Sequence, residues 1–175
     1  MKSDQRWLLV TGGNLLFLFL CIQVNHYLAA IPASLFLFGL PVGFAALRLN
    51  LPQGLAATAL IGFFYDTLTP FPLGTAFVLF TTAFTFIYAV RSQFHREEAF
   101  STLIVVLLAN LFLFAAFSTV SAVTNGSAGH PGRLVVDLIV SQFALALTTG
   151  WFFAFQIAIL ELFGIRLDEE QREAR

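Results

Sequence analysis

Long apolar runs recur along this chain at intervals of roughly 20 residues, the length that a helix needs to cross a membrane. Only 11% of the residues are charged, whereas a soluble domain has about 25%. The runs are continuous and lack the alternation that marks the strands of an outer-membrane barrel. The sequence therefore predicts an all-α polytopic membrane protein that forms a single membrane domain over residues 1–175.

Six transmembrane helices are expected, separated by polar or Pro-rich breaks. The first is predicted to be an uncleaved membrane helix, because its apolar character continues past the usual cleavage site of a signal peptide. The second contains Pro41 in its interior and is expected to be kinked, broken or short. A charged cytoplasmic tail is expected at 166–175. The predicted helix bounds are about 7–24, 28–47, 53–66, 74–90, 100–123 and 134–163.

Positive charge is distributed unevenly among the connections between these helices. With both termini inside, only Arg133 falls on the outer side. Cytoplasmic segments carry an excess of Lys and Arg, so the pattern favours an N-in, C-in orientation with six crossings. The first turns of the last helix, with Arg133 and Asp137, are expected to project into water. The residues on the inner side are then Lys2, Arg6, Arg48, Arg91, Arg96, Arg166, Arg172 and Arg175.

Small residues recur every four positions in the third segment, and the same spacing reaches Asp66. Positions four apart lie on one stripe of an α-helix, and small residues let membrane helices approach closely. We expect this stripe to serve helix packing or partner binding, and the spacing leaves open whether the neighbouring helix belongs to the same chain. The predicted contact residues, including the turn that follows, are Gly54, Thr58, Gly62, Asp66, Pro70, Pro72 and Gly74.

Asp66 is the one acid that the sequence places in such an apolar setting. A carboxylate at membrane depth is costly and is therefore a functional candidate. Three roles are open to it: a structural role at the outer interface, where it would cap its helix or the following turn; contact with a partner or ligand; or proton coupling. The predicted topology places Asp66 at the outer rim, where a carboxylate costs less.

Four side-chain amides fall at membrane depth, and they are expected to form hydrogen bonds between helices. A small-molecule site would need several such groups to converge beside an aromatic ring, and spacing alone does not show convergence. These residues are Asn14, Asn110, Gln142 and Gln156.

The sequence contains no pattern of residues that predicts catalysis or metal binding. The three histidines are dispersed, and no nucleophile stands in a known motif. The single cysteine, Cys21, excludes an internal disulfide and a multi-cysteine metal site. We therefore expect no enzyme activity, no metal and no cofactor. The inner cluster that includes Arg91 and Arg96 is expected to determine topology and to offer a contact surface to a cytoplasmic partner.

The stretch Gly54-Leu-Ala-Ala-Thr-Ala-Leu-Ile-Gly62-Phe-Phe-Tyr-Asp66, with its Pro-containing turn and Leu73-Gly74-Thr75, resembles the rod shape-determining protein MreD family. The rest of the chain matches that family only in hydropathy. The resemblance implies a non-enzymatic scaffold or regulatory subunit of the elongasome in the bacterial inner (plasma) membrane. Such a subunit binds an MreC-like protein. It works beside MreB filaments, RodA and a class B penicillin-binding protein in cell shape and lateral cell wall synthesis.

The MreD family is also similar in fold to the substrate-binding subunits of energy-coupling-factor vitamin transporters, which supplies an alternative function. Those subunits carry a small-residue pattern on an early helix for docking their coupling partner. Here Ala29-x-x-x-Ala33 is the early candidate, and Pro32 interrupts it. A third hypothesis, a membrane enzyme of lipid or isoprenoid metabolism, has no acid cluster or nucleophile–base pair in its favour.

Overall fold

The computed structural model of the chain describes residues 6–28, 30, 34–69, 71–93, 99–125 and 131–164. The described part is helical apart from turns and one extended stretch, and it contains no strand, so the predicted all-α class is confirmed. The predicted tail 166–175, Pro70 and Arg96 lie outside the described residues. The elements are α1 (Arg6–Leu28), α2 (Gly39–Arg48), α3 (Leu51–Leu68), α4 (Thr75–Val90), the 3-10 helix η2 (Arg91–Gln93), α5 (Ala99–Asn125) and α6 (Pro131–Leu162).

Three of the described helices are long and apolar enough to cross a membrane, which is consistent with the expected membrane protein. They cover Arg6–Leu28, Phe100–Thr124 and Gly132–Leu162. The helix Thr75–Val90 is also apolar but shorter.

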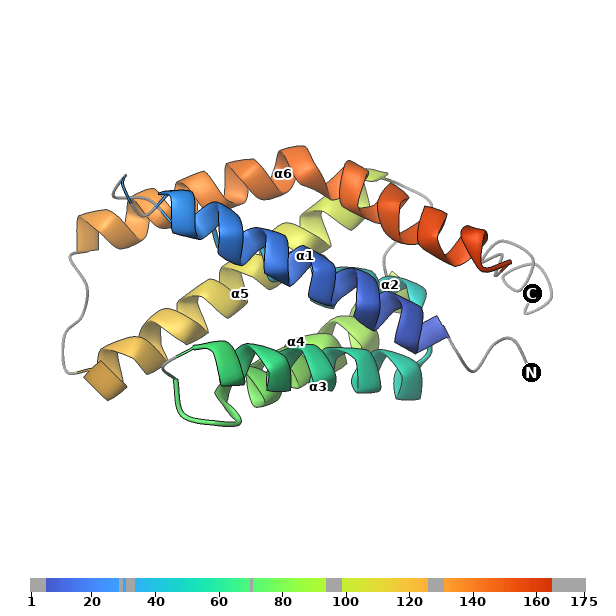
Figure 1. The fold of residues 1–175 in the computed structure, drawn as a ribbon, viewed down its shortest axis with the longest axis horizontal. Helices are drawn as coiled ribbons and strands as arrows, with labels where there is room; N and C mark the ends of the chain where they lie inside the picture. Colours follow the sequence, from blue (N-terminus) through green and yellow to red (C-terminus); the bar gives the residue numbers. More distant parts are fainter. Residues whose placement is uncertain are drawn as a thin grey trace.

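The helices form an elongated bundle with two distinct ends (Figure 1). At one end, here called the terminal end, α1 begins and α6 finishes. At the opposite end, the turn end, α3 turns into α4, α5 finishes and α6 begins. The helices α3 and α4 form a hairpin and make the most extensive contact in the molecule, while α2 packs mainly on α5 and α4.

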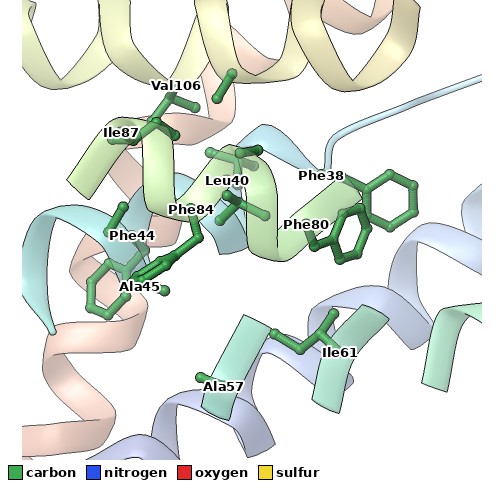
Figure 2. Packing of buried hydrophobic residues seen from close by; sticks show 14 of the residues in the cluster. Phe38, Leu40, Phe44, Ala45, Ala57, Ile61, Phe80, Phe84, Ile87 and Val106 are labelled. Carbon is green, nitrogen blue, oxygen red and sulfur yellow. The ribbon is translucent and has the colours of Figure 1, made fainter. Parts of the chain in front are cut away.

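The short helix α2 lies at the centre of the core. Every residue from Gly39 to Leu47 is buried, as expected for a helix that is apolar on all sides. Figure 2 shows Phe84 of α4 directed toward Ala45 and Phe44 of α2, and Ile87 beside Val106 of α5. The hairpin and α5 are therefore joined through α2.

The helix α2 begins at Gly39 and not near residue 28, because residues 34–37 before it are extended. Pro41 falls in its first turn, where a missing N–H breaks no intrahelical bond, so this proline helps to start the short helix. Gly39 and Gly43 let α2 lie directly on α5. A Cβ at Gly39 would come within 2.5 Å of the Val106 carbonyl oxygen. The Gly-x-x-x-Gly spacing was a signal for this contact that the sequence analysis did not use.

Candidate functional site

The small-residue stripe of α3 faces α4 of the same chain. A Cβ at Gly62 would lie 2.7 Å from the Phe77 Cα and 2.8 Å from its nitrogen, and a Cβ at Gly54 would overlap the Phe84 ring. Thr58 is fully buried, and its hydroxyl donates to the Gly54 carbonyl at 2.8 Å. The stripe thus brings two backbones into contact, which is the purpose that small residues serve in membrane helices.

Asp66 ends this stripe, and its carboxylate binds the beginning of α4. Its side chain is 2% exposed. Oδ1 accepts the Ala76 N–H at 2.8 Å, and Oδ2 accepts the N–H groups of Gly74 at 3.0 Å and Phe77 at 3.1 Å. A helix N-terminus has unpaired amides and a partial positive charge, so a carboxylate there is held by both. Of the roles open to Asp66, the geometry shows the structural one, as a cap on the next helix.

Gly74 supplies the backbone conformation that makes this cap possible. Its φ is +94°, a left-handed value that favours glycine, and it is the residue immediately before α4. The Thr75 N–H donates to the Pro72 carbonyl at 3.1 Å, so Pro72 also takes part in closing the turn, although its own side chain is exposed. The predicted turn residues that the structure describes therefore act together with Asp66.

An aromatic cluster lies beneath the turn. Phe71 of the turn packs on Phe117 of α5, with ring centroids 5.5 Å apart. Tyr65 contacts the same Phe117 ring at 5.7 Å and the Phe38 ring at 4.5 Å. The rings of Phe38 and Phe80 lie side by side in Figure 2. Phe71 thus anchors the turn to α5, within a cluster of rings that also joins α3, α4 and the residue before α2.

Asp137 is a second buried acid, and the expectation that it projects into water is wrong. Asp137 is 6% exposed, and its Oδ1 accepts the Ser34 N–H at 2.8 Å. Arg133, one helical turn earlier, is largely exposed and lies 3.9 Å from the other carboxylate oxygen. No local pattern in the sequence points to Asp137 as a buried acceptor, because its partner stands 103 positions away along the chain.

Asp137 belongs to a set of side chains that bind the extended residues 34–37. Asn25 pairs with the Leu35 backbone in both directions: its Nδ2 donates to the carbonyl at 2.8 Å, and its Oδ1 accepts the N–H at 2.7 Å. The Phe36 N–H donates to the Ser141 hydroxyl at 2.9 Å. Side chains from α1 and α6 thus replace the hydrogen bonds that a helix would have made within itself.

The predicted hydrogen bonds of the four membrane-depth amides are confirmed. Gln156 of α6 donates to Asn14 of α1 at 2.7 Å, and both residues are fully buried. Gln142 donates to a backbone carbonyl of α5 at 3.2 Å, while Asn110 of α5 accepts the first N–H of α2 at 3.1 Å. These four residues bind helices to one another and do not converge on one point.

An apolar groove of about 310 Å³ lies between α4 and α5. The atoms exposed in it are all apolar. Its floor includes the buried Ala83 and Ala109, whereas Phe86, Leu108 and Phe112 are exposed at its rim. The groove can accept apolar side chains or a hydrocarbon chain.

Arg91 follows α4 and is fastened to the bundle. One of its guanidinium nitrogens donates to the carbonyls of Leu49 at 2.9 Å and Ala46 at 3.2 Å, at the C-terminal end of α2. The guanidinium carbon also lies 3.6 Å from the centre of the Tyr88 ring, a cation–π contact. Arg91 therefore closes the other end of the hairpin. Its contact with a cytoplasmic partner stays a prediction.

The fold and these contacts define a class: an all-helical bundle whose apolar helices suit a membrane and whose described polar side chains mainly bind the chain to itself. Comparisons of the chain with protein-family models, with curated proteins and with solved structures found no match. The resemblance to the MreD family thus stays a prediction based on residues 51–90.

Proposed function

We propose that this chain is a non-enzymatic scaffold of the bacterial inner membrane that binds the transmembrane helix of an MreC-like protein. It would act beside MreB filaments, RodA and a class B penicillin-binding protein in cell shape and lateral wall synthesis. The observation that carries the proposal is the apolar groove between α4 and α5. Membrane helices associate through close packing, and a groove with Ala on its floor and Phe at its rim suits the side chains of such a helix.

The proposed scaffold crosses the membrane six times, with both termini inside. The second crossing is the least regular of the six. Its ten-residue helix α2 reaches about 15 Å at 1.5 Å per residue. The hydrocarbon thickness is about 30 Å. The proposed crossing therefore also needs the non-helical residues 34–37 and the turn at Phe38, which precede α2. The side chains that bind residues 34–37 support this crossing, because backbone at membrane depth must be satisfied by protein.

The use of the polar groups supports a scaffold more than a vitamin-binding subunit. Asp66 and Asp137 both accept backbone N–H groups of their own chain, and the membrane-depth amides join helices. The groove exposes apolar atoms only, so its occupant is expected to be apolar.

Cysteine cross-linking to the partner tests this proposal. In a Cys21→Ala background, Leu108→Cys places a thiol at the groove rim, and Phe143→Cys places one on α6 at similar exposure. Each variant is co-expressed with the MreC-like protein of the same genome, which carries single cysteines along its transmembrane helix. We expect disulfide-linked pairs from position 108 and none from position 143.

Two results would contradict the proposal in different ways. Co-purification with equal cross-linking from both positions would exclude the groove as the contact. Failure of well-expressed protein to co-purify with the MreC-like protein, or tight binding of a vitamin to the purified chain, would exclude the scaffold function itself.

A further inference from the structure

The helices of the α3–α4 hairpin are shorter than α5 and α6. At 1.5 Å per residue, the 18 residues of α3 and the 16 residues of α4 reach about 27 Å and about 24 Å, less than the hydrocarbon thickness of about 30 Å. The 27 residues of α5 and the 32 residues of α6 reach about 40 Å and about 48 Å. Figure 1 shows α5 and α6 extending past the α3–α4 turn at the turn end of the bundle.

The hairpin turn, residues 69 and 71–74 of the described chain, carries no charged side chain. Between Arg48 and Arg91, the sequence contains one charged residue, Asp66, and that residue is buried. The side chains that the turn region exposes are instead apolar: Leu73 is 76% exposed and Leu68 is 61% exposed. Exposed leucines without charged neighbours favour contact with an apolar environment.

The first N–H groups of α4, directly after the turn, are satisfied without water. The four N–H groups from Gly74 to Phe77 would ordinarily lack partners at a helix start. Three of them donate to Asp66, and the fourth donates to the Pro72 carbonyl. Near the end of α3, the Thr69 hydroxyl donates to the Tyr65 carbonyl at 3.0 Å. Internal pairing of this kind is required where lipid replaces water.

Given the membrane crossing proposed for α3 and α4, we propose that the hairpin turn lies within the bilayer, beneath the lipid headgroups. There Leu73 of the turn and Leu68 at the end of α3 contact the lipid chains. Asp66 accepts N–H groups at the start of α4 that would otherwise be unpaired in this low-dielectric environment. The bilayer is locally thin beside the hairpin, because a short apolar element draws the headgroups toward it.

Collision accessibility of spin labels tests the depth of the turn. The full chain, with Cys21→Ala, carries one label at Leu73→Cys, Val123→Cys or Phe86→Cys in vesicles of phosphatidylethanolamine and phosphatidylglycerol. The three native side chains are similarly exposed, at 76%, 79% and 70%. We expect labels at 73 and 86 to collide mainly with oxygen, which dissolves in hydrocarbon. The label at 123, near the end of the long α5, should collide mainly with a water-soluble nickel chelate.

Each other outcome overturns the inference. Preference for the nickel chelate at 73, with oxygen preferred at 86, would place the turn in water while the hairpin still crosses. Shielding of position 73 from both reagents would mean that protein covers the turn. Preference for the nickel chelate at 86 would exclude the crossing itself. The chain is labelled without any partner protein. Failure to bind the MreC-like protein would therefore not change the accessibility measured at any of the three positions.

Insertion of a charge gives a second readout. Leu73→Asp should lower the yield of folded protein in vesicles while leaving it unchanged in detergent micelles, because a micelle deforms around a charge more easily than a bilayer. Val123→Asp is the matched control and should have no effect in either medium. Equal yields of the two variants in vesicles would contradict a turn beneath the headgroups.

Discussion

Asp66 and Asp137 are both buried carboxylates that accept backbone N–H groups, but they satisfy different kinds of backbone. Asp66 caps a helix that begins nine residues later, and both of its oxygens are used. Asp137 binds one N–H of an extended stretch more than a hundred residues away. The comparison shows two uses of a buried acid: one closes a local hairpin, and the other fastens a distant segment to the bundle.

The two sites also differ in how much depends on the charge. Three donors surround Asp66 at the positive end of a helix, so the ionised form suits its surroundings. Among the residues that the structure describes, Asp137 has one backbone donor, and its cation, Arg133, is 3.9 Å away and largely exposed. A neutral acceptor should therefore replace Asp137 far better than it replaces Asp66.

Removal of the Asp66 side chain should have the largest effect. Asp66→Ala leaves three amides without an acceptor. Hydrogen bonds to charged groups contribute about 1.5–3 kcal/mol each, so even the low end of this range gives a loss of about 4.5 kcal/mol. Asp66→Asn keeps one carbonyl oxygen and should recover less than half of this loss. The measurement is unfolding of the purified chain in mixed detergent micelles. Wild-type stability of Asp66→Asn would show that the charge is dispensable.

Gly62→Ala should be the next most damaging change, and it separates packing from capping. The added Cβ would meet the Phe77 backbone at 2.7–2.8 Å. Overpacking costs about 1–3 kcal/mol, and because the obstacle is backbone and not a flexible side chain, we expect a loss of about 3 kcal/mol. Gly150→Ala is the control, because a Cβ there meets nothing within 4 Å. The same unfolding assay should show a loss for the first variant only. An equal response of both variants would contradict close contact between α3 and α4.

Asp137→Ala should cost less than either change, about 2 kcal/mol, because one buried N–H loses its acceptor. Asp137→Asn retains a carbonyl oxygen in the same place and should remain within about 1 kcal/mol of the wild type, the usual range of one neutral hydrogen bond. Hydrogen exchange at the Ser34 amide, read by mass spectrometry of peptides from that region, locates the effect. Faster exchange in the Ala variant alone is expected, and unchanged exchange in both would remove the assigned contact.

The hydrogen bond between Gln156 and Asn14 should have the smallest effect. A double-mutant cycle with Gln156→Leu and Asn14→Leu should give a coupling energy of about 0.6 kcal/mol, the average for hydrogen bonds between membrane helices. The substitutions should leave the hydrogen bonds of Asp66 and Asp137 unchanged, because Gln156 and Asn14 join α6 to α1. A coupling energy of zero would mean that the bond is not formed in the folded protein.

The sequence alone determined the class of fold, the approximate places of the helices and the importance of residues 51–90. These follow from apolar runs and from four-residue spacing, which are local properties of a helix. The stripe and Asp66 could be found in this way because α3, the turn and α4 are consecutive. Spacing could not show that the stripe faces α4, since small residues suit a partner helix equally well.

The tertiary structure alone decided the role of Asp137, the extended stretch before α2 and the groove between α4 and α5. An apolar run with polar residues near it predicts a helix, because a helix satisfies its own backbone. Residues 34–37 depart from this rule, since Asn25, Asp137 and Ser141 supply hydrogen bonds from distant parts of the chain. Contacts of that kind depend on how helices pack in three dimensions, and a one-dimensional pattern does not contain them.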